Sequence, residues 1–136
     1  MSQTELIAGL NEALNRELST IIRYMLQGSM IKGRQNQSLR AMYREEVTDE
    51  IGHAQYLADK IVMLGGTPKV SPDLTPPPDD VARMIENDLA KELSDVAHYK
   101  KLADLAEKTG DIELKMQMEE QAADESRHAD ELRRMI

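Results

Sequence analysis

Apolar residues recur along most of the chain at intervals of three and four positions, the spacing of one face of an α-helix. Four long segments carry this pattern, and we find no competing strand-like alternation of apolar and polar residues. We therefore predict an all-α protein with helices over approximately residues 2–31, 36–64, 79–108 and 112–136.

Two of the three connections between these segments are short. Gly33 lies in the first connection, and Thr109-Gly110-Asp111 forms the last. Helices that are joined by short turns pack as antiparallel neighbours. We therefore predict two helical hairpins, one in each half of the chain.

The middle connection, residues 65–78, contains all five prolines and is predicted to be extended. Its 14 residues can span ~45 Å at ~3.3 Å each, about the length of a 30-residue helix. The connection can therefore run the whole length of a bundle and leave the second and third helices parallel. One long crossover is typical of the ferritin-like four-helix bundle, and we predict that residues 1–136 form a single domain of this kind.

The two predicted hairpins are similar in sequence. A shift of 75 residues superimposes many positions of the first half on identical residues of the second half. Many of the matched residues are polar, which indicates that the repeat preserves more than a core. The positions Leu14, Glu17, Leu18, Ser19, Tyr24, Glu45, Asp49, Glu50, His53, Ala54, Leu57 and Ile61 match Leu89, Glu92, Leu93, Ser94, Tyr99, Glu120, Asp124, Glu125, His128, Ala129, Leu132 and Ile136.

Glutamate or histidine side chains interrupt the apolar face of every predicted helix, although a buried carboxylate is costly unless its charge is compensated. In the first hairpin, the midpoint between Glu17 and Glu50 falls at the Gly33 turn. In the second hairpin, the midpoint between Glu92 and Glu125 falls at the other turn, so each pair lies side by side. The candidate metal ligands that converge near mid-bundle are Glu17, Glu50, His53, Glu92, Glu125 and His128.

Four carboxylates and two imidazoles suit a pair of divalent cations. The carboxylates offset the cations' charge and can bridge metals roughly 3.5–4 Å apart. One Glu from each of two helices, with Glu-x-x-His from each of the other two, is the ligand pattern of ferritin-like di-iron proteins. Such mixed ligands suit iron or manganese better than copper or a structural zinc. Buried ion pairs could account for one Glu-x-x-His, but not for two at matched depth.

The residues around this set are open to more than one interpretation. Asp49 and Asp124 each precede a candidate glutamate and are predicted to hydrogen-bond the free ring nitrogen of a histidine. Tyr24 and Tyr99 either hydrogen-bond a ligand carboxylate, supply an electron, or are core tyrosines that need a partner. Glu46 lies one turn from a candidate ligand and could relay iron, but the repeat places a glutamine at its counterpart.

Composition and charge narrow the classes of function. The chain contains no cysteine, which excludes disulfides, zinc ribbons and iron–sulfur clusters. Its net charge of −8 argues against binding to nucleic acids or acidic membranes and is compatible with a protein that takes in cations. No signal peptide or membrane-spanning apolar run is present, so we expect a cytoplasmic protein.

Four stretches around the candidate ligands match the motifs of a known family. They are Glu17-Leu18 through Tyr24, Asp49-Glu50-Ile51-Gly52-His53-Ala54, Asp88-Leu89-Ala90-Lys91-Glu92-Leu93 and Asp124-Glu125-Ser126-Arg127-His128. The chain resembles the bacterioferritins from about Glu12 to Ala129. The resemblance implies a di-iron ferroxidase centre within each subunit, with two iron ions on the six candidate ligands and with Glu50 and Glu125 as the bridging pair. The implied reaction is oxidation of Fe2+ to Fe3+ by O2 or peroxide, coupled to iron storage or detoxification.

Three features depart from the bacterioferritin pattern. Ile51 stands where the family has its haem-ligating methionine, so we expect no haem at that place. Glu45 replaces the histidine that, with the Asp49 position, forms the family's inner-surface iron site. The sequence ends eight residues after His128, without the short fifth helix that helps to close the family's 24-subunit cage. We therefore expect a smaller homo-oligomer, either a twelve-subunit shell or a dimer.

Two other functions are compatible with such a bundle. A rubrerythrin-like peroxidase normally receives electrons from an iron domain built on four cysteines, so this cysteine-free chain would need an external reductase. A non-catalytic haem-binding or electron-transfer dimer would show the Soret band of haem, which a di-iron centre lacks.

Overall fold

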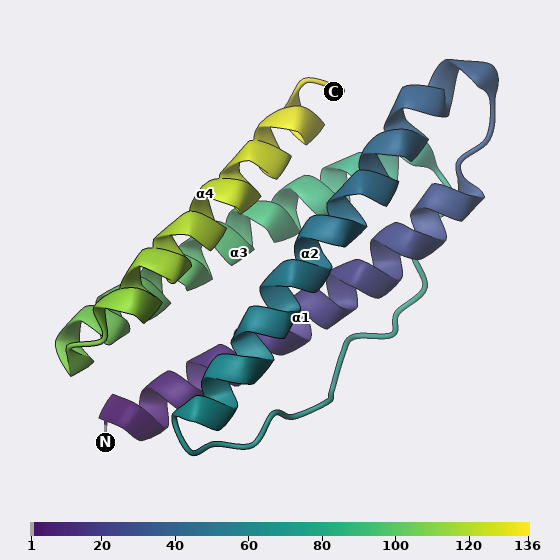
Figure 1. The fold of residues 1–136 in the computed structure, drawn as a ribbon. Coiled ribbons are helices and arrows are strands. Elements are labelled where there is room, and N and C mark those ends of the chain that lie inside the picture. Colours follow the sequence, from purple (N-terminus) through teal and green to yellow (C-terminus); the bar gives the residue numbers. More distant parts are fainter. Residues whose placement is uncertain (1) are drawn as a thin grey trace.

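The computed structural model describes residues 2–136 and consists of four α-helices without a strand in that range (Figure 1). The all-α prediction and the ferritin-like bundle are confirmed. A short 3₁₀ turn precedes the second helix. The elements are α1 (Ser2–Met30), η1 (Arg34–Asn36), α2 (Gln37–Met63), α3 (Val81–Thr109) and α4 (Ile112–Arg133).

The second hairpin is bounded by side-chain caps and a glycine. Asp80 accepts a hydrogen bond from the Ala82 amide and begins α3, and Asp111 accepts one from the Leu114 amide and begins α4. Gly110 has a φ of 79°, a left-handed conformation that suits glycine at a helix end. The predicted end of the fourth helix is wrong by three residues, because α4 stops at Arg133.

The helices form two antiparallel hairpins that are joined by the predicted crossover (Figure 1). Close contacts join α1 to α2, α3 to α4 and α1 to α3, whereas α2 and α4 do not approach as closely over the described part of the chain. The crossover runs along the outside of the bundle, so that α2 and α3 are parallel. Within residues 2–136, no helix combines the length and apolarity that a membrane span needs.

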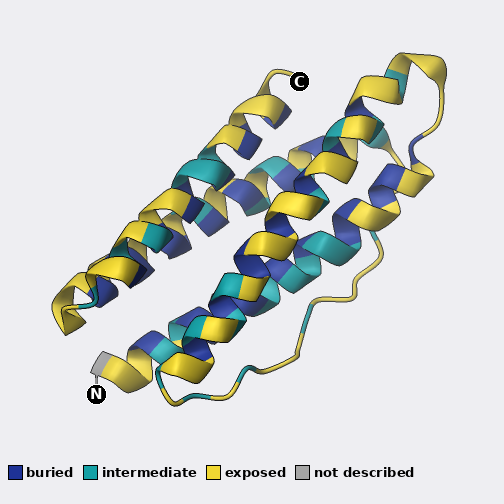
Figure 2. Cartoon of the chain, in the orientation of Figure 1, coloured by how far each residue is buried: buried dark blue, intermediate teal, exposed yellow. Residues whose placement is uncertain are grey.

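Buried residues follow the inward faces of all four helices (Figure 2). They form two apolar clusters. The first includes Leu10, Leu57, Leu102, Leu114 and Met118, and the second includes Tyr24, Leu39, Tyr43, Met84 and Leu132. Met135 lies beyond the end of α4 and is 39% exposed, so it is not part of this core.

The crossover is fastened to α1 by a row of polar side chains one helical turn apart. Asn11, Asn15 and Ser19 lie four residues apart, which is an advance of ~6 Å along a helix. Two extended residues advance about as far, so every second crossover residue meets the next side chain. The backbone groups that are bound in this way belong to Thr67, Lys69, Ser71 and Asp73.

Candidate metal centre

The structure brings all six predicted ligands together in the interior of the bundle. Every one of these residues is at most 6% exposed. Each helix supplies at least one of them, and α2 and α4 each supply a glutamate and a histidine one turn apart. The predicted ligands are Glu17 on α1, Glu50 and His53 on α2, Glu92 on α3, and Glu125 and His128 on α4.

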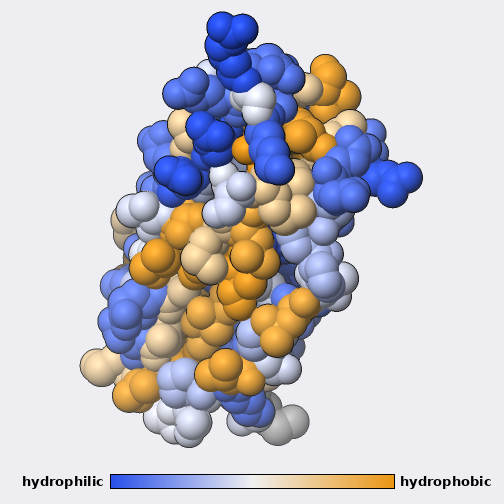
Figure 3. Space-filling view, turned by 90° about the vertical axis from the view of Figure 1, so that its right-hand side faces the viewer, coloured by the Kyte–Doolittle hydropathy of each residue, from blue (hydrophilic) through white to orange (hydrophobic). Residues whose placement is uncertain are grey.

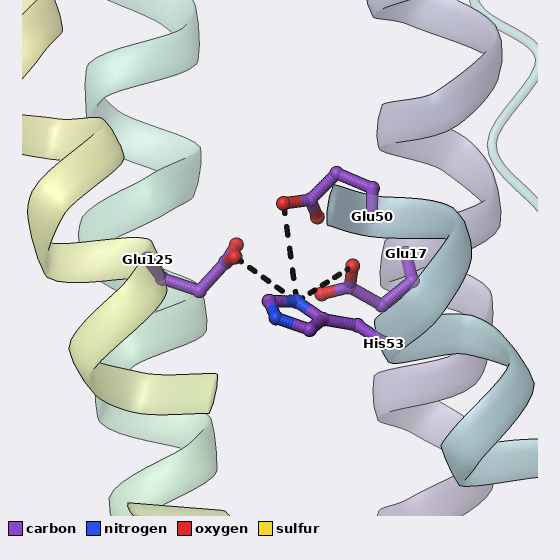
Figure 4. A group of neighbouring side chains, drawn as sticks. All are labelled: Glu17, Glu50, His53 and Glu125. Carbon is purple, nitrogen blue, oxygen red and sulfur yellow. Dashed lines mark ion pairs between the residues drawn. The ribbon is translucent and has the colours of Figure 1, made fainter. Parts of the chain in front are cut away.

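The six residues divide into two overlapping groups of four, and within each group the potential ligand atoms lie within 4.8 Å of one another. In the group shown in Figure 4, His53 points between carboxylates from α1, α2 and α4. His53 Nδ1 lies 3.3 Å from an oxygen of Glu125 and 3.5 Å from one of Glu17. The first group is Glu17, Glu50, His53 and Glu125, and the second is Glu50, Glu92, Glu125 and His128.

Glu50 and Glu125 are the residues that belong to both groups. His128 Nδ1 mirrors His53, at 3.2 Å from Glu50 Oε1 and 3.5 Å from Glu125 Oε1. A carboxylate that faces two cation positions can give one oxygen to each. Glu50 and Glu125 are therefore the candidates for bridging ligands.

The ligand atoms are buried without hydrogen-bond partners. Both oxygens of Glu50 and of Glu125 are unpartnered, as is one oxygen of each remaining glutamate and one nitrogen of each histidine. Buried polar atoms are normally paired, because an unmet one costs roughly 1–3 kcal/mol or more. Here the unpartnered atoms are carboxylate oxygens and imidazole nitrogens, and they converge on two points. This arrangement fits a pair of divalent cations. The atoms are Glu17 Oε2, Glu50 Oε1 and Oε2, His53 Nδ1, Glu92 Oε2, Glu125 Oε1 and Oε2, and His128 Nδ1.

Tyrosine hydroxyls fix the two glutamates that belong to one group only. Tyr99 donates a hydrogen bond of 2.7 Å to Glu17 Oε1, and Tyr24 donates one of 2.6 Å to Glu92 Oε1. The second oxygen of each glutamate is thereby turned toward its histidine. Of the interpretations left open for these tyrosines, the hydrogen bond to a ligand carboxylate is therefore realised, and it crosses between the two halves of the chain.

Aspartates orient the two imidazole rings as predicted. His53 Nε2 lies 2.8 Å from an oxygen of Asp124, and His128 Nε2 lies 3.2 Å from one of Asp49. These contacts also cross between the halves, because each aspartate holds the histidine of the other hairpin. With Nε2 engaged by a carboxylate, Nδ1 of each ring is left to face the cation position.

In the metal-free state, several of these groups hold protons more tightly than usual. Burial, reinforced by neighbouring carboxylates, raises the pKa of Glu50 and of Glu125. The surrounding carboxylates outweigh burial for the histidines, raising the pKa of His53, and that of His128 to about 12. In the metal-free protein, bound protons therefore offset the negative charge of the buried carboxylates, as bound cations would.

We expect the binding of two divalent cations near pH 7 to release protons, because metal ligands must be deprotonated and these residues hold protons more tightly than usual. Calorimetric titration of the metal-free protein in buffers of different ionisation enthalpy measures the number of protons released. Cation binding without proton release would contradict the raised pKa values.

The same four groups make the stability of the metal-free protein depend on pH. All four pKa values are raised on folding, so the free energy of unfolding falls as pH rises. The metal-free protein should therefore melt at a lower temperature at pH 8 than at pH 5.

A second buried polar cluster, which the sequence did not reveal, adjoins the centre. Asp88 is fully buried and accepts hydrogen bonds from Arg23 at 2.7 Å, Gln27 at 2.6 Å and Tyr43 at 2.7 Å. The ring of Tyr43 packs edge-on against that of Tyr24, with centroids 4.8 Å apart. The cluster therefore supports one of the tyrosines that position a ligand.

Comparisons with known proteins show the family and the fold of the chain. The ferritin-like domain family matches residues 7–136. A bacterioferritin of Brucella melitensis is 30% identical over 132 residues, which cover 94% of this chain and 80% of the relative. A ferritin-like di-iron-carboxylate protein from Bacillus anthracis superposes with a TM-score of 0.95 and 38% identity, over 99% of this chain and 97% of that one. Rhodobacter capsulatus bacterioferritin, with a metal-free dinuclear site and a haem iron, superposes with a TM-score of 0.83 and 28% identity, over 96% and 82% of the two chains.

Proposed function

Because this chain belongs to the ferritin-like family, on its bacterioferritin branch, we propose that it stores or detoxifies iron by oxidising Fe2+ to Fe3+ at the buried centre. The observation that carries the proposal is the convergence of eight buried, unpartnered donor atoms on two cation positions. If these residues formed only structural ion pairs, fewer of their atoms would lack a hydrogen-bond partner.

Each residue has a distinct role in this proposal. Glu17 and His53 would hold one iron, Glu92 and His128 the other, and both bridging glutamates would hold the pair. The bound pair supplies two electrons, one from each Fe2+, to a single oxidant. O2 with two protons then becomes H2O2, or H2O2 with two protons becomes two waters. The tyrosines and aspartates keep the carboxylates and rings oriented, and the apolar clusters exclude bulk water.

The proposal is tested by adding Fe2+ aerobically to the metal-free protein and following oxidation in the near ultraviolet. We expect a rapid phase that consumes about two Fe2+ per chain, with either O2 or peroxide as the oxidant. Oxidation no faster than in buffer alone would refute the proposal. A rapid phase that requires peroxide and a separate electron donor would instead identify the rubrerythrin-like peroxidase.

Residue 51 is expected to ligate no haem, and this stays a prediction. Ile51 has no donor atom, and its side chain is 52% exposed on the outer face of α2. An absorption spectrum of the isolated protein checks the point, since stoichiometric haem gives a Soret band. A stoichiometric haem ligated by any methionine would show that the Ile51 substitution does not prevent haem binding.

We expect assembly into a closed homo-oligomer of fewer than 24 subunits, either a twelve-subunit shell or a dimer. Figure 3 shows apolar side chains gathered at the middle of the face on which α2, the second half of α1 and the crossover lie. Exposed apolar patches of this kind mark surfaces that contact other protein chains. Analytical ultracentrifugation measures the mass of the assembly, and a mass near that of 24 chains of 15.4 kDa would refute the expectation. The exposed apolar residues on these elements are Met25, Leu26, Met30, Ile51, Val62, Met63, Val70 and Leu74.

A further inference from the structure

A cavity of about 240 Å³ lies between α1, α3 and the crossover. Two of the residues that line it, Thr20 and Asp95, are at most 4% exposed and form its inner wall. Thr20 comes three residues after the predicted ligand Glu17, and Asp95 comes three residues after Glu92. Residues three apart share one face of a helix, so the cavity leads toward the metal centre. The charged residues of its wall are Arg16, Arg23, Asp73, Lys91 and Asp95.

Asp95 is the buried acid of this cavity. Its Oδ1 atom accepts a hydrogen bond of 3.0 Å from Arg16, and the same guanidinium pairs with Glu12 at 3.2 Å. One cation therefore serves two carboxylates, while Asp95 also faces the carboxylates of Glu17 and Glu92. Burial, reinforced by these two carboxylates and opposed by Arg16, raises the pKa of Asp95 to about 7. The group can therefore both hold and release a proton near neutral pH.

The corresponding position in the first half of the chain is neutral. The repeat places Thr20 opposite Asp95, so the bundle packs at this position without an acid. The hydroxyl of Thr20 accepts a hydrogen bond of 3.3 Å from Arg23, whose guanidinium is also paired with a carboxylate of α3. Lys91 and Asp73 add one charge of each sign to the cavity wall. Asp95 is thus the acid that combines burial near the centre with a place on the cavity wall.

We propose that Asp95 carries protons between water in this cavity and the metal centre. The proposed oxidation takes up two protons when O2 receives two electrons and becomes H2O2. Each transfer moves one proton from cavity water to the Asp95 carboxylate and on to the reduced oxygen, so that Asp95 returns to its starting state. A water molecule can bridge a gap in such a path, and the cavity has room for several at about 30 Å³ each. The inference rests on the proposed function, because it takes Fe2+ oxidation as the step that consumes protons.

The test follows the rapid phase of Fe2+ oxidation by O2 in H2O and in D2O. Asp95→Asn keeps the size of the side chain and an acceptor oxygen for Arg16, but it cannot take up a proton. Proton transfer by a positioned group contributes ~10²–10⁴-fold, and water replaces part of it, so we expect this variant to be slower by about tenfold or more. Its solvent isotope effect should exceed that of the parent, because proton delivery then limits the rate. Asp104→Asn is the matched control, since this exposed aspartate of α3 lies outside the cavity, and it should match the parent in both measurements.

Binding of Mn2+, measured by equilibrium dialysis, separates a proton relay from a structural role. Asp95→Asn should still bind about two Mn2+ per chain. Weaker binding, or slower oxidation with the isotope effect of the parent, would make Asp95 a structural residue and overturn the inference. Oxidation at the parent rate would also overturn it, because protons would then reach the centre by another path, and the proposed function would stand. A parent protein without a rapid phase would overturn both.

Discussion

Glu50→Ala should abolish rapid Fe2+ oxidation and, at the same time, make the metal-free protein more stable. Removing a residue that merely orients a metal ligand commonly costs 10–100-fold, so loss of a ligand that both ions share should cost more than roughly a hundredfold. Glu50 makes no hydrogen bond with either oxygen. The substitution therefore removes a buried carboxyl group that has no hydrogen-bond partner. We expect this removal to stabilise the metal-free protein by about 1–3 kcal/mol. Stopped-flow oxidation and thermal melts of the metal-free protein measure the two effects.

Glu17→Ala is the matched comparison, because it removes a carboxylate that faces one cation position only. It should lose less activity than Glu50→Ala. It should also gain less stability, because the hydroxyl of Tyr99 loses its acceptor. If Glu50→Ala oxidised iron at the parent rate, the ferroxidase proposal would fall. If it strongly destabilised the metal-free protein, these residues would be structural ion pairs instead.

Asp88→Ala should cause the largest loss of stability. The change leaves the Arg23 guanidinium buried without its carboxylate and removes the acceptor of Gln27 and Tyr43. Breaking a buried ion pair from one side typically costs about 3–5 kcal/mol, out of a total stability of roughly 5–15 kcal/mol. Urea unfolding of the metal-free protein measures the change.

Asp104→Ala provides the control for Asp88→Ala. Asp104 lies on the same helix but is exposed, so its removal should change the free energy of unfolding by less than about 0.5 kcal/mol. Asp88→Asn keeps one acceptor oxygen and should fall between the two. Equal unfolding midpoints for Asp88→Ala and the parent would mean that the cluster contributes nothing to stability.

Most of the fold follows from local sequence signals. Gly33 and the Gly110 turn mark the hairpin turns, and the prolines between residues 65 and 78 mark the crossover. The helix ends are less predictable, because the last residues of a helix are held by only a few backbone bonds. The apolar pattern runs on to Ile136, but α4 ends at Arg133 and passes into a turn at Arg134 and Met135, whose amides still bond back to α4.

The convergence of the six candidate ligands was predictable because the repeat contains the same residues in both halves of the chain. The Asp88 cluster was not, because the repeat pairs Asp88 with Ala13 and Tyr43 with Met118. Its donors come from α1 and α2, so no spacing within one helix reveals them. The available signal was the position of Asp88 one helical turn before Glu92, on the same face. The exchange of tyrosine and aspartate contacts between the halves depends on how the hairpins pack, which periodicity does not specify.

That exchange means that neither hairpin can build a cation position alone. Each position takes three ligands from one half and a bridging glutamate from the other, and its tyrosine and aspartate also come from the other half. A half-length chain would contain one full set of residue types but would need a second copy to assemble either position. Its metal affinity would then depend on protein concentration. The crossover removes that dependence, because joining the two hairpins in one chain makes their encounter intramolecular.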